Sequence, residues 1–190
     1  MSLQANRGQG EQNPSRFVYN LSYLLPFGKG KSLLSSGVPS VIAGGWSMDS
    51  IVTFEAGYYV TAIMPSDIWN VGSTDSLRPD VLHDPNLPAS QRTPQLWFDT
   101  AAFARPAQYQ YGNAGRSIVE GPGLLNVDFS LHRTFRIKES STLQFRFDAF
   151  NGTNHTNFGL PGLSYGTSTF GVIGSAAESR DLQFGLRFRF

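Results

Sequence analysis

The last eleven residues of the chain, 180–190, alternate strictly between polar and apolar side chains. The apolar positions are Leu182, Phe184, Leu186, Phe188 and Phe190, and the polar side carries Asp181, Gln183, Gly185, Arg187 and Arg189. Because successive side chains of a β-strand point to opposite faces, such a strand has one wholly apolar face and one charged face. The alternation continues to the final aromatic residue, which favours a strand between lipid and water over a strand of a soluble sandwich.

Four further segments show the same period-two alternation. They span residues 16–25, 46–56, 125–135 and 142–150. Each is about as long as the ~9 to 11 residues with which a tilted strand crosses a bilayer. In a helix, apolar residues at i, i+2 and i+4 would be spread around the axis and form no stripe. The sequence therefore predicts an all-β fold, an antiparallel meander of about five transmembrane strands in which each strand pairs with its sequence neighbour.

The connections between these segments alternate in length. A tight turn at 138–141 and a modest connection at 26–45 are short, whereas 58–123 and 151–179 are long. Outer-membrane barrels have short periplasmic turns and long extracellular loops, so we expect the two long connections to be extracellular. In the hairpin formed by 125–135 and 142–150, even-numbered residues are predicted to face the lumen. Opposed residue numbers then add up to 278 or 280, and either register brings His132 within reach of Asp148.

Composition agrees with a sheet in contact with lipid. Charged residues make up 15% of the chain, against about 25% in an average globular domain, and aromatic residues make up 13%. No run approaches the ~20 apolar residues of a spanning helix. The net charge of +1 and the absence of a basic block give no electrostatic signature of nucleic-acid binding.

The sequence lacks motifs for covalent chemistry. His83, His132 and His155 have no metal-ligand spacing, there is no cysteine, and no nucleophile motif such as G-x-S-x-G is present. We therefore expect no enzyme activity, metal or cofactor. The first residues contain no apolar signal-peptide core, so we also expect the chain to be part of a longer protein. Residues 1–15 are then a loop remnant or a disordered N-terminus.

Two groups of side chains are candidates for contact with a ligand. Polar residues predicted to face the lumen are Asp49, Glu55, Asp128, His132, Arg146, Asp148, Arg187 and Arg189. They could line a channel or hold a plug, but pairing of these charges across strands is the favoured interpretation. Aromatic residues of the first long loop are Trp97, Phe98, Phe103, Tyr109 and Tyr111. They could stack on a ligand, although such residues more often fold a loop onto a small core of its own.

Several sequence blocks occur in a characteristic order. They are PFGKGK at 26–31, WFDTAAF at 97–103, GNAGR at 112–116, FRFDAFN at 145–151 and the closing strand. Together they resemble the C-terminal end of large TonB-dependent outer-membrane receptors. The group that they resemble most is the Oar-like one, whose members carry a carboxypeptidase-regulatory-like N-terminal domain. The resemblance covers residues 16–190, which are expected to form one barrel segment.

The resemblance implies a barrel of about 22 strands, of which this chain supplies the last five, in the cell outer membrane. It implies binding and import of a solute by the complete receptor, and a fragment that is inactive alone. The implied partners are outer-membrane lipid, the rest of the barrel with its plug, a TonB-type energising protein, and the barrel-assembly machinery, which would read Leu182, Phe184, Leu186, Phe188 and Phe190. A soluble, secreted β-sandwich module that binds a carbohydrate or another ligand is the alternative.

Overall fold

The computed structural model describes residues 15–67 and 77–190 and divides into two compact units. The sheet unit comprises residues 16–54, 125–156 and 178–190, and the loop unit comprises Ser15, the described residues of 55–124, and residues 157–177. Regular structure is almost entirely β. Within the described residues, no helix has the length and apolar character needed to span a membrane.

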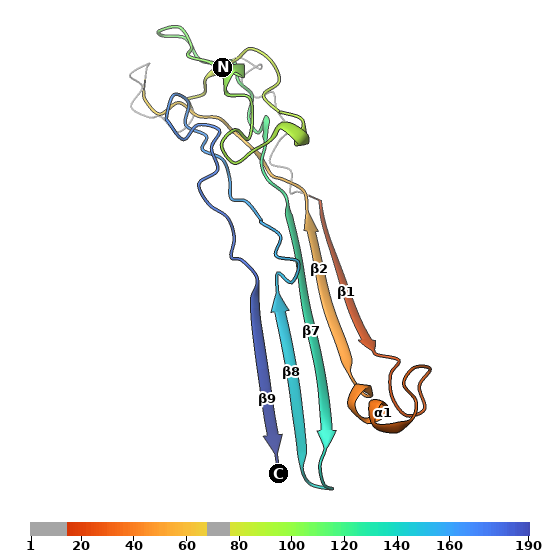
Figure 1. Ribbon diagram of the computed structural model, residues 1–190. Helices are drawn as coiled ribbons and strands as arrows, with labels where there is room; N and C mark the ends of the chain where they lie inside the picture. Colours follow the sequence, from red (N-terminus) through yellow and green to blue (C-terminus); the bar gives the residue numbers. More distant parts are fainter. Residues whose placement is uncertain (1–14, 68–76) are drawn as a thin grey trace. The chain divides into compact units, whose positions relative to one another are not determined.

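The sheet unit is a five-stranded antiparallel meander, as predicted (Figure 1). Its strands are β1 (Arg16–Leu24), β2 (Ser47–Glu55), β7 (Leu124–Arg136), β8 (Thr142–Phe150) and β9 (Asp181–Arg189). They lie in the order β1-β2-β7-β8-β9, so each of the five pairs with its neighbour in the sequence. The predicted boundaries agree with the observed ones to within one residue. β1 and β9 are the two edges of this sheet, which does not close into a barrel.

The register of the β7–β8 hairpin has the predicted parity. His132 lies opposite Arg146, and Phe129 lies opposite Ala149, so the opposed residue numbers add up to 278. The connection between Arg136 and Thr142 is the five-residue turn that this sum requires. Because directly opposed residues share a face, the pairing of the strands also assigns every side chain of β7 and β8 to one of two faces.

One face of the sheet is apolar and exposed. On it Leu143 pairs with Phe188, and Phe147 pairs with Phe184. Phe184 and Leu186 are each 72% exposed, so no other part of the described chain covers them. A sandwich would bury such a face against a second sheet, whereas in an outer-membrane barrel lipid covers it.

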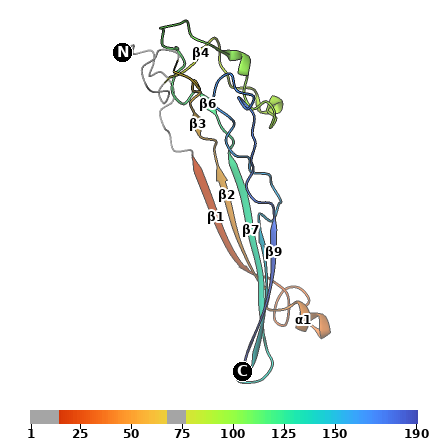
Figure 2. The ribbon, with the colours of Figure 1, turned by 90° about the vertical axis from the view of Figure 1, so that its left-hand side faces the viewer.

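The connection between β1 and β2 contains a helix that the sequence did not predict. α1 (Gly37–Ala43) has Ser36 as its N-cap residue and is followed by Gly44. Pro39 is tolerated because the first amides of a helix have no partner within it. Figure 2 shows α1 standing off the sheet at the end where the β7–β8 turn lies.

The loop unit is built around a small aromatic core. Phe98, Phe103 and Phe170 form a triangle of edge-to-face rings with centroids 5.1 to 5.8 Å apart. Two short ladders surround it: β3 (Tyr59–Val60) pairs with β6 (Val119–Glu120), and β4 (Asp80–Val81) pairs with β5 (Phe103–Ala104). Two single-turn 3-10 helices, η2 (Ala89–Gln91) and η3 (Thr100–Ala102), complete the unit. The long connections therefore fold as a compact body.

Candidate functional site: the polar face of the sheet and the loop aromatics

The polar face of the sheet carries the predicted lumen-facing residues. Pairing places His132 opposite Arg146 and Asp148 opposite Gln183, with Arg187 opposite Gln144 and Arg189 opposite Thr142. Asp128 joins them by the alternation of β7, and Asp49 joins them through its contact with His132. Glu55 is the last residue of β2 and shares the parity of Asp49. The structure thus brings the predicted set onto one face.

Asp49 connects three strands of this face. Its Oδ1 accepts a hydrogen bond of 2.6 Å from Ser22 Oγ of β1, and its Oδ2 lies 3.3 Å from His132 Nδ1 of β7. His132 is therefore paired with a carboxylate on β2, while Asp148 lies at the diagonal position that the register predicts. Both side chains of the Asp49–His132 pair are partly exposed, so the contact is open to water.

Two other carboxylates on this face bind groups close to them. Asp148 accepts two hydrogen bonds from Arg146 Nε, at 2.9 and 2.8 Å, within a single strand. Asp128 Oδ1 accepts from Asn126 Nδ2 at 2.9 Å and from the backbone N–H of Asn151 at 3.0 Å. Asp128 thereby fixes the start of the connection that follows β8. Of these contacts, Arg146–Asp148 joins opposite charges, and it does so within one strand, whereas the partners of Asp128 are uncharged, so pairing of charges across strands stays a prediction.

Arg187 and Arg189 differ from the other charges. Both lie on the edge strand β9, both are exposed, and neither forms a salt bridge within the described residues. Their direct partners across the ladder are the uncharged Gln144 and Thr142. Their predicted role in lining a lumen stays a prediction.

The structure divides the predicted loop aromatics into two kinds. Phe98 and Phe103 are 1% and 5% exposed and belong to the core of the loop unit, and Trp97 packs against that core. Trp97 Nε1 also donates to the carbonyl of Glu120 at 2.9 Å. Tyr109 and Tyr111 are 75% and 72% exposed. Buried rings cannot stack on a ligand, which removes Phe98 and Phe103, and Trp97 is partly buried, so Tyr109 and Tyr111 are the two exposed candidates of this set.

Tyr109 is presented by an unusual turn. Its φ of +64° lies in the left-handed region, which is uncommon for a residue other than glycine, asparagine or aspartate. The turn is closed by a hydrogen bond of 3.0 Å from Gln110 N–H to the carbonyl of Ala107.

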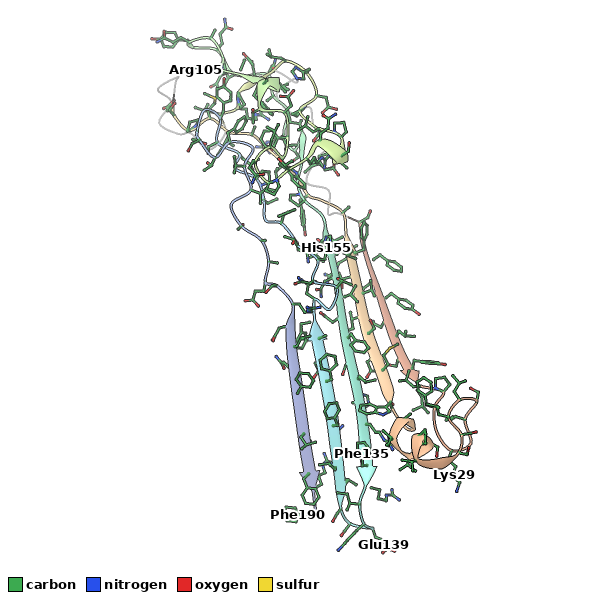
Figure 3. All side chains as sticks on the ribbon, viewed as in Figure 1. Lys29, Arg105, Phe135, Glu139, His155 and Phe190 are labelled. Atoms are coloured by element: carbon green, nitrogen blue, oxygen red, sulfur yellow. The ribbon has the colours of Figure 1, made fainter. Side chains whose placement is uncertain are left out.

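A hollow of about 550 Å³ in the loop unit is lined by Ser66, Asp67, Arg105, Pro106 and Gln108. Arg105 is labelled in Figure 3. The lining is mostly polar, and its Gln108 directly precedes the exposed Tyr109.

The loop unit contains a hydrogen-bonded pair of a histidine and an aspartate. Asp99 is the N-cap of η3, and its Oδ2 lies 2.9 Å from His83 Nε2. The hydrogen bond from His83 is the largest cause of the lowered pKa of Asp99. Burial opposes it, and the backbone N–H groups of Ala101 and Ala102 lower the pKa further. Among residues 15–67 and 77–190 no cluster of His, Asp and Glu side chains could hold a metal ion.

Arg133 is a residue with a structural role that was not predicted from the sequence. This residue occupies an apolar-face position of β7, opposite Phe145, where the alternation calls for an apolar side chain. The break in the apolar alternation at residue 133 was the sequence signal that could have identified Arg133.

The residues predicted to be read by the assembly machinery lie on the apolar face of β9. These are Leu182, Phe184, Leu186 and Phe188, and Phe190 follows the strand with 95% of its surface exposed.

Comparison with known proteins agrees with this geometry. The family model described as "Outer membrane beta barrel domain" matches residues 2–183. Neither a curated protein nor a solved structure matches the chain. The match covers nearly the whole sequence, and the apolar and polar faces of the sheet are those of a barrel wall. The chain belongs to the outer membrane β-barrel domain family and is a protein of the outer membrane.

Proposed function

We propose that the chain forms the C-terminal part of the barrel of a TonB-dependent receptor, which binds a solute outside the cell and imports it. The observation that supports this most is the two-faced meander whose long connections fold into a unit with a core of its own. The resemblance of the sequence blocks to Oar-like receptors supplies the finer assignment. The function rests on binding and gating, with no covalent step.

A sheet of five strands requires additional strands to close. Single-chain outer-membrane barrels have at least eight strands, and an open edge in hydrocarbon would leave backbone N–H and C=O groups without partners. We therefore infer that β1 and β9 pair with strands outside the described sheet. The unpaired Arg187 and Arg189 on β9 suit the lumen beside such a junction.

The solute would be recognised first by the loop unit. Tyr109 and Tyr111 provide exposed rings, and the hollow lined by Arg105, Gln108 and Ser66 provides hydrogen-bonding groups. The aromatic core of the loop unit would support the loops that carry these groups, and its buried rings would not contact the solute. On the polar face of the sheet unit, Arg187 and Arg189 would offer separate cationic contacts.

The sandwich alternative receives no support from the sheet unit. A soluble module would have to cover the aromatic face of β9, yet Phe184 and Leu186 are among the most exposed apolar residues of the chain. The long open face therefore argues for lipid contact.

The proposal is tested by comparing periplasmic solutes, using untargeted mass spectrometry, in cells that carry the parent protein or the double variant Tyr109→Ala, Tyr111→Ala. We expect one or a few solutes to fall in the variant, and the same solutes to fall when the proton gradient is collapsed. A matched control is Tyr23→Ala, because this exposed tyrosine lies on the apolar face of β1. An unchanged solute profile, with the protein present in the membrane at normal amounts, would contradict import.

A further inference from the structure

The short helix α1 exposes an apolar stripe. Val38, Val41 and Ile42 are spaced i, i+3 and i+4, so they lie on one side of the helix, and they are 70%, 67% and 65% exposed. No residue of α1 is buried. Leu33 and Leu34, which precede the helix, are about half exposed as well. A stripe of this kind in water would be unfavourable, because each branched side chain loses the ~1.5 to 3 kcal/mol that burial provides.

The helix is fixed to the apolar face of the sheet by polar contacts at its C-terminal end. The guanidinium of Arg133 donates to the carbonyl of Val41 at 2.6 Å and to the carbonyl of Ile42. Trp46 Nε1 donates to the same carbonyl of Ile42 at 3.1 Å. These bonds satisfy carbonyl groups that have no partner within the helix. A cation near the C-terminal end also interacts favourably with the helix dipole.

Close backbone packing adds to this attachment. A Cβ atom on Gly28 would lie 2.5 Å from the Cα of Gly44, the residue that follows the helix, and Gly28 has a φ of +104°. Only glycine allows the two segments to approach so closely. Two contacts therefore hold the helix: the hydrogen bonds to its C-terminal carbonyl groups, and the packing of Gly44 against Gly28 in the loop that precedes the helix.

The position of Arg133 explains why a charged residue is tolerated on the lipid-facing side of the sheet. An arginine there costs ~2 to 4 kcal/mol at the bilayer midplane but only ~0 to 1 kcal/mol near the interface. Arg133 lies three residues before the end of β7, and its guanidinium lies 4.1 Å from the ring centre of Phe135. Trp46 packs edge-on against Phe135 and Phe145. An indole and a guanidinium among such rings are typical of the membrane–water interface.

We propose that α1 is an interfacial anchor whose stripe of Val38, Val41 and Ile42 enters the phospholipid leaflet at the short-turn end of the barrel. The stripe continues the apolar face of the sheet, because Arg133 attaches the helix from that face. The connection 26–45 contains Lys29 and Lys31 and no acidic residue, which complements lipid phosphates. Figure 3 shows Lys29, Phe135 and Phe190 at the same end of the sheet unit. Since short turns are periplasmic, the leaflet is the periplasmic one.

The test uses single cysteines, which this sequence allows because it has none of its own. Nitroxide labels are placed at Val38, Ile42 and Ser36 in the complete barrel, reconstituted in phosphatidylethanolamine–phosphatidylglycerol vesicles. Phe184 serves as the lipid reference and Glu139, in the β7–β8 turn, as the aqueous reference. We expect labels at Val38 and Ile42 to be reached by oxygen and shielded from a water-soluble nickel complex, as at Phe184, and the label at Ser36 to behave as at Glu139.

Labels at Val38 and Ile42 that are as accessible to the nickel complex as the label at Glu139 would overturn the anchor. If the label at Phe184 is also aqueous, the lipid-facing assignment of the whole face falls, and the anchor falls with it. The test does not depend on solute import, so a failure of the proposed transport function would leave its result unchanged.

The role of Arg133 is tested with the same labels. Arg133→Ala should free the helix and give the label at Ile42 a narrower, more mobile spectrum with greater access to the nickel complex. Arg136→Ala is the matched control, since it removes the same charge three residues further on but from the polar face. Equal spectra for the two variants would refute the attachment of α1 by Arg133, and the labels in the parent protein still decide the lipid contact if Arg133→Ala fails to fold.

Discussion

Asp49 shows how a single carboxylate can join strands of a barrel wall. It accepts a hydrogen bond from Ser22 on β1 and faces His132 on β7, so it links the strands on both sides of its own strand, β2. The contacts are partly open to water, which limits their strength because solvent screens the charges. The contacts among Ser22, Asp49 and His132 therefore contribute more to the positions of these side chains on the polar face than to the stability of the sheet.

This leads to a first prediction. In a double-mutant cycle of Asp49→Asn and His132→Ala, measured by urea unfolding of the complete barrel, we expect a coupling energy of ~0.2 to 1 kcal/mol. The pair Asp181→Asn and His132→Ala is the control and should show no coupling, because Asp181 lies on β9 and binds Gln183. A coupling energy of zero for Asp49 and His132 would mean that the contact does not form in the membrane.

The His83–Asp99 pair of the loop unit gives a second prediction. Because the hydrogen bond from His83 lowers the pKa of Asp99, His83→Ala should raise that pKa toward the ordinary carboxyl range, as followed by NMR titration of the carboxyl carbon. A lowered pKa in the folded state stabilises it above the unfolded value of about 3.9, and this stabilisation is lost as the pH falls through the folded value. The stability difference between parent and variant should therefore shrink in acid. An identical pKa in both proteins would contradict the assignment.

At this scale, the face of a residue could be predicted but its partner often could not. Alternation placed His132 on the polar face and fixed the parity of its hairpin, because both are local properties of neighbouring strands. Its partner Asp49 lies on β2, whose alignment with β7 depends on a connection of some 70 residues. In the loop, both Phe98 and Tyr109 are aromatic, and long-range packing buries the first and leaves the second exposed.

The elements of the loop unit owe their order to a few rings. The edge-to-face triangle of Phe98, Phe103 and Phe170 joins residues from the two long connections. Arg92 adds an outer layer, since it lies over the ring of Trp97 and donates to Glu120 at 2.7 Å. The core is small, so each ring is a large part of it.

A third prediction follows for this core. Phe98→Ala removes a side chain that is 1% exposed, and large-to-small substitutions of this kind cost ~3 to 5 kcal/mol. Limited proteolysis of the assembled protein should therefore cut the variant within the loop unit much faster than the parent. Tyr109→Ala is the control and should change the cleavage rate little, because the ring is exposed. Equal cleavage of parent and Phe98→Ala would show that the triangle does not hold the loops.

The sequence predicted the elements of the sheet better than those outside it. Strands 16–24 and 142–150 form as expected because period-two alternation is a local pattern with one structural solution. The helix α1 could not be read from GVPSVIA, which combines glycine, proline and branched residues of low helix propensity. Its last carbonyl groups are satisfied by Arg133, which is distant in the sequence, and by Trp46, which lies just before β2.

For the whole molecule, the sheet explains how the chain is placed in the membrane. Its apolar face carries the residues that we predict an assembly factor to read, and Phe188 and Phe190 stack with ring centres 6.0 Å apart at the end of β9. We predict that Phe190→Ser in the complete protein lowers the amount found in the outer membrane several-fold, as measured by immunoblot of membrane fractions. Arg189→Ser, which changes the polar face, should have a much smaller effect. Normal assembly of Phe190→Ser would remove this role.

The central claim, that one face of the sheet meets lipid, is tested most directly on β9. Cysteines are introduced one at a time from 182 to 189 in the complete barrel, labelled with a fluorophore and exposed to brominated phospholipids. The account predicts strong quenching at 182, 184, 186 and 188 and weak quenching at 183, 185, 187 and 189, in agreement with the pairing of β8 and β9. Quenching without a period of two, or strongest at the odd positions, would contradict it.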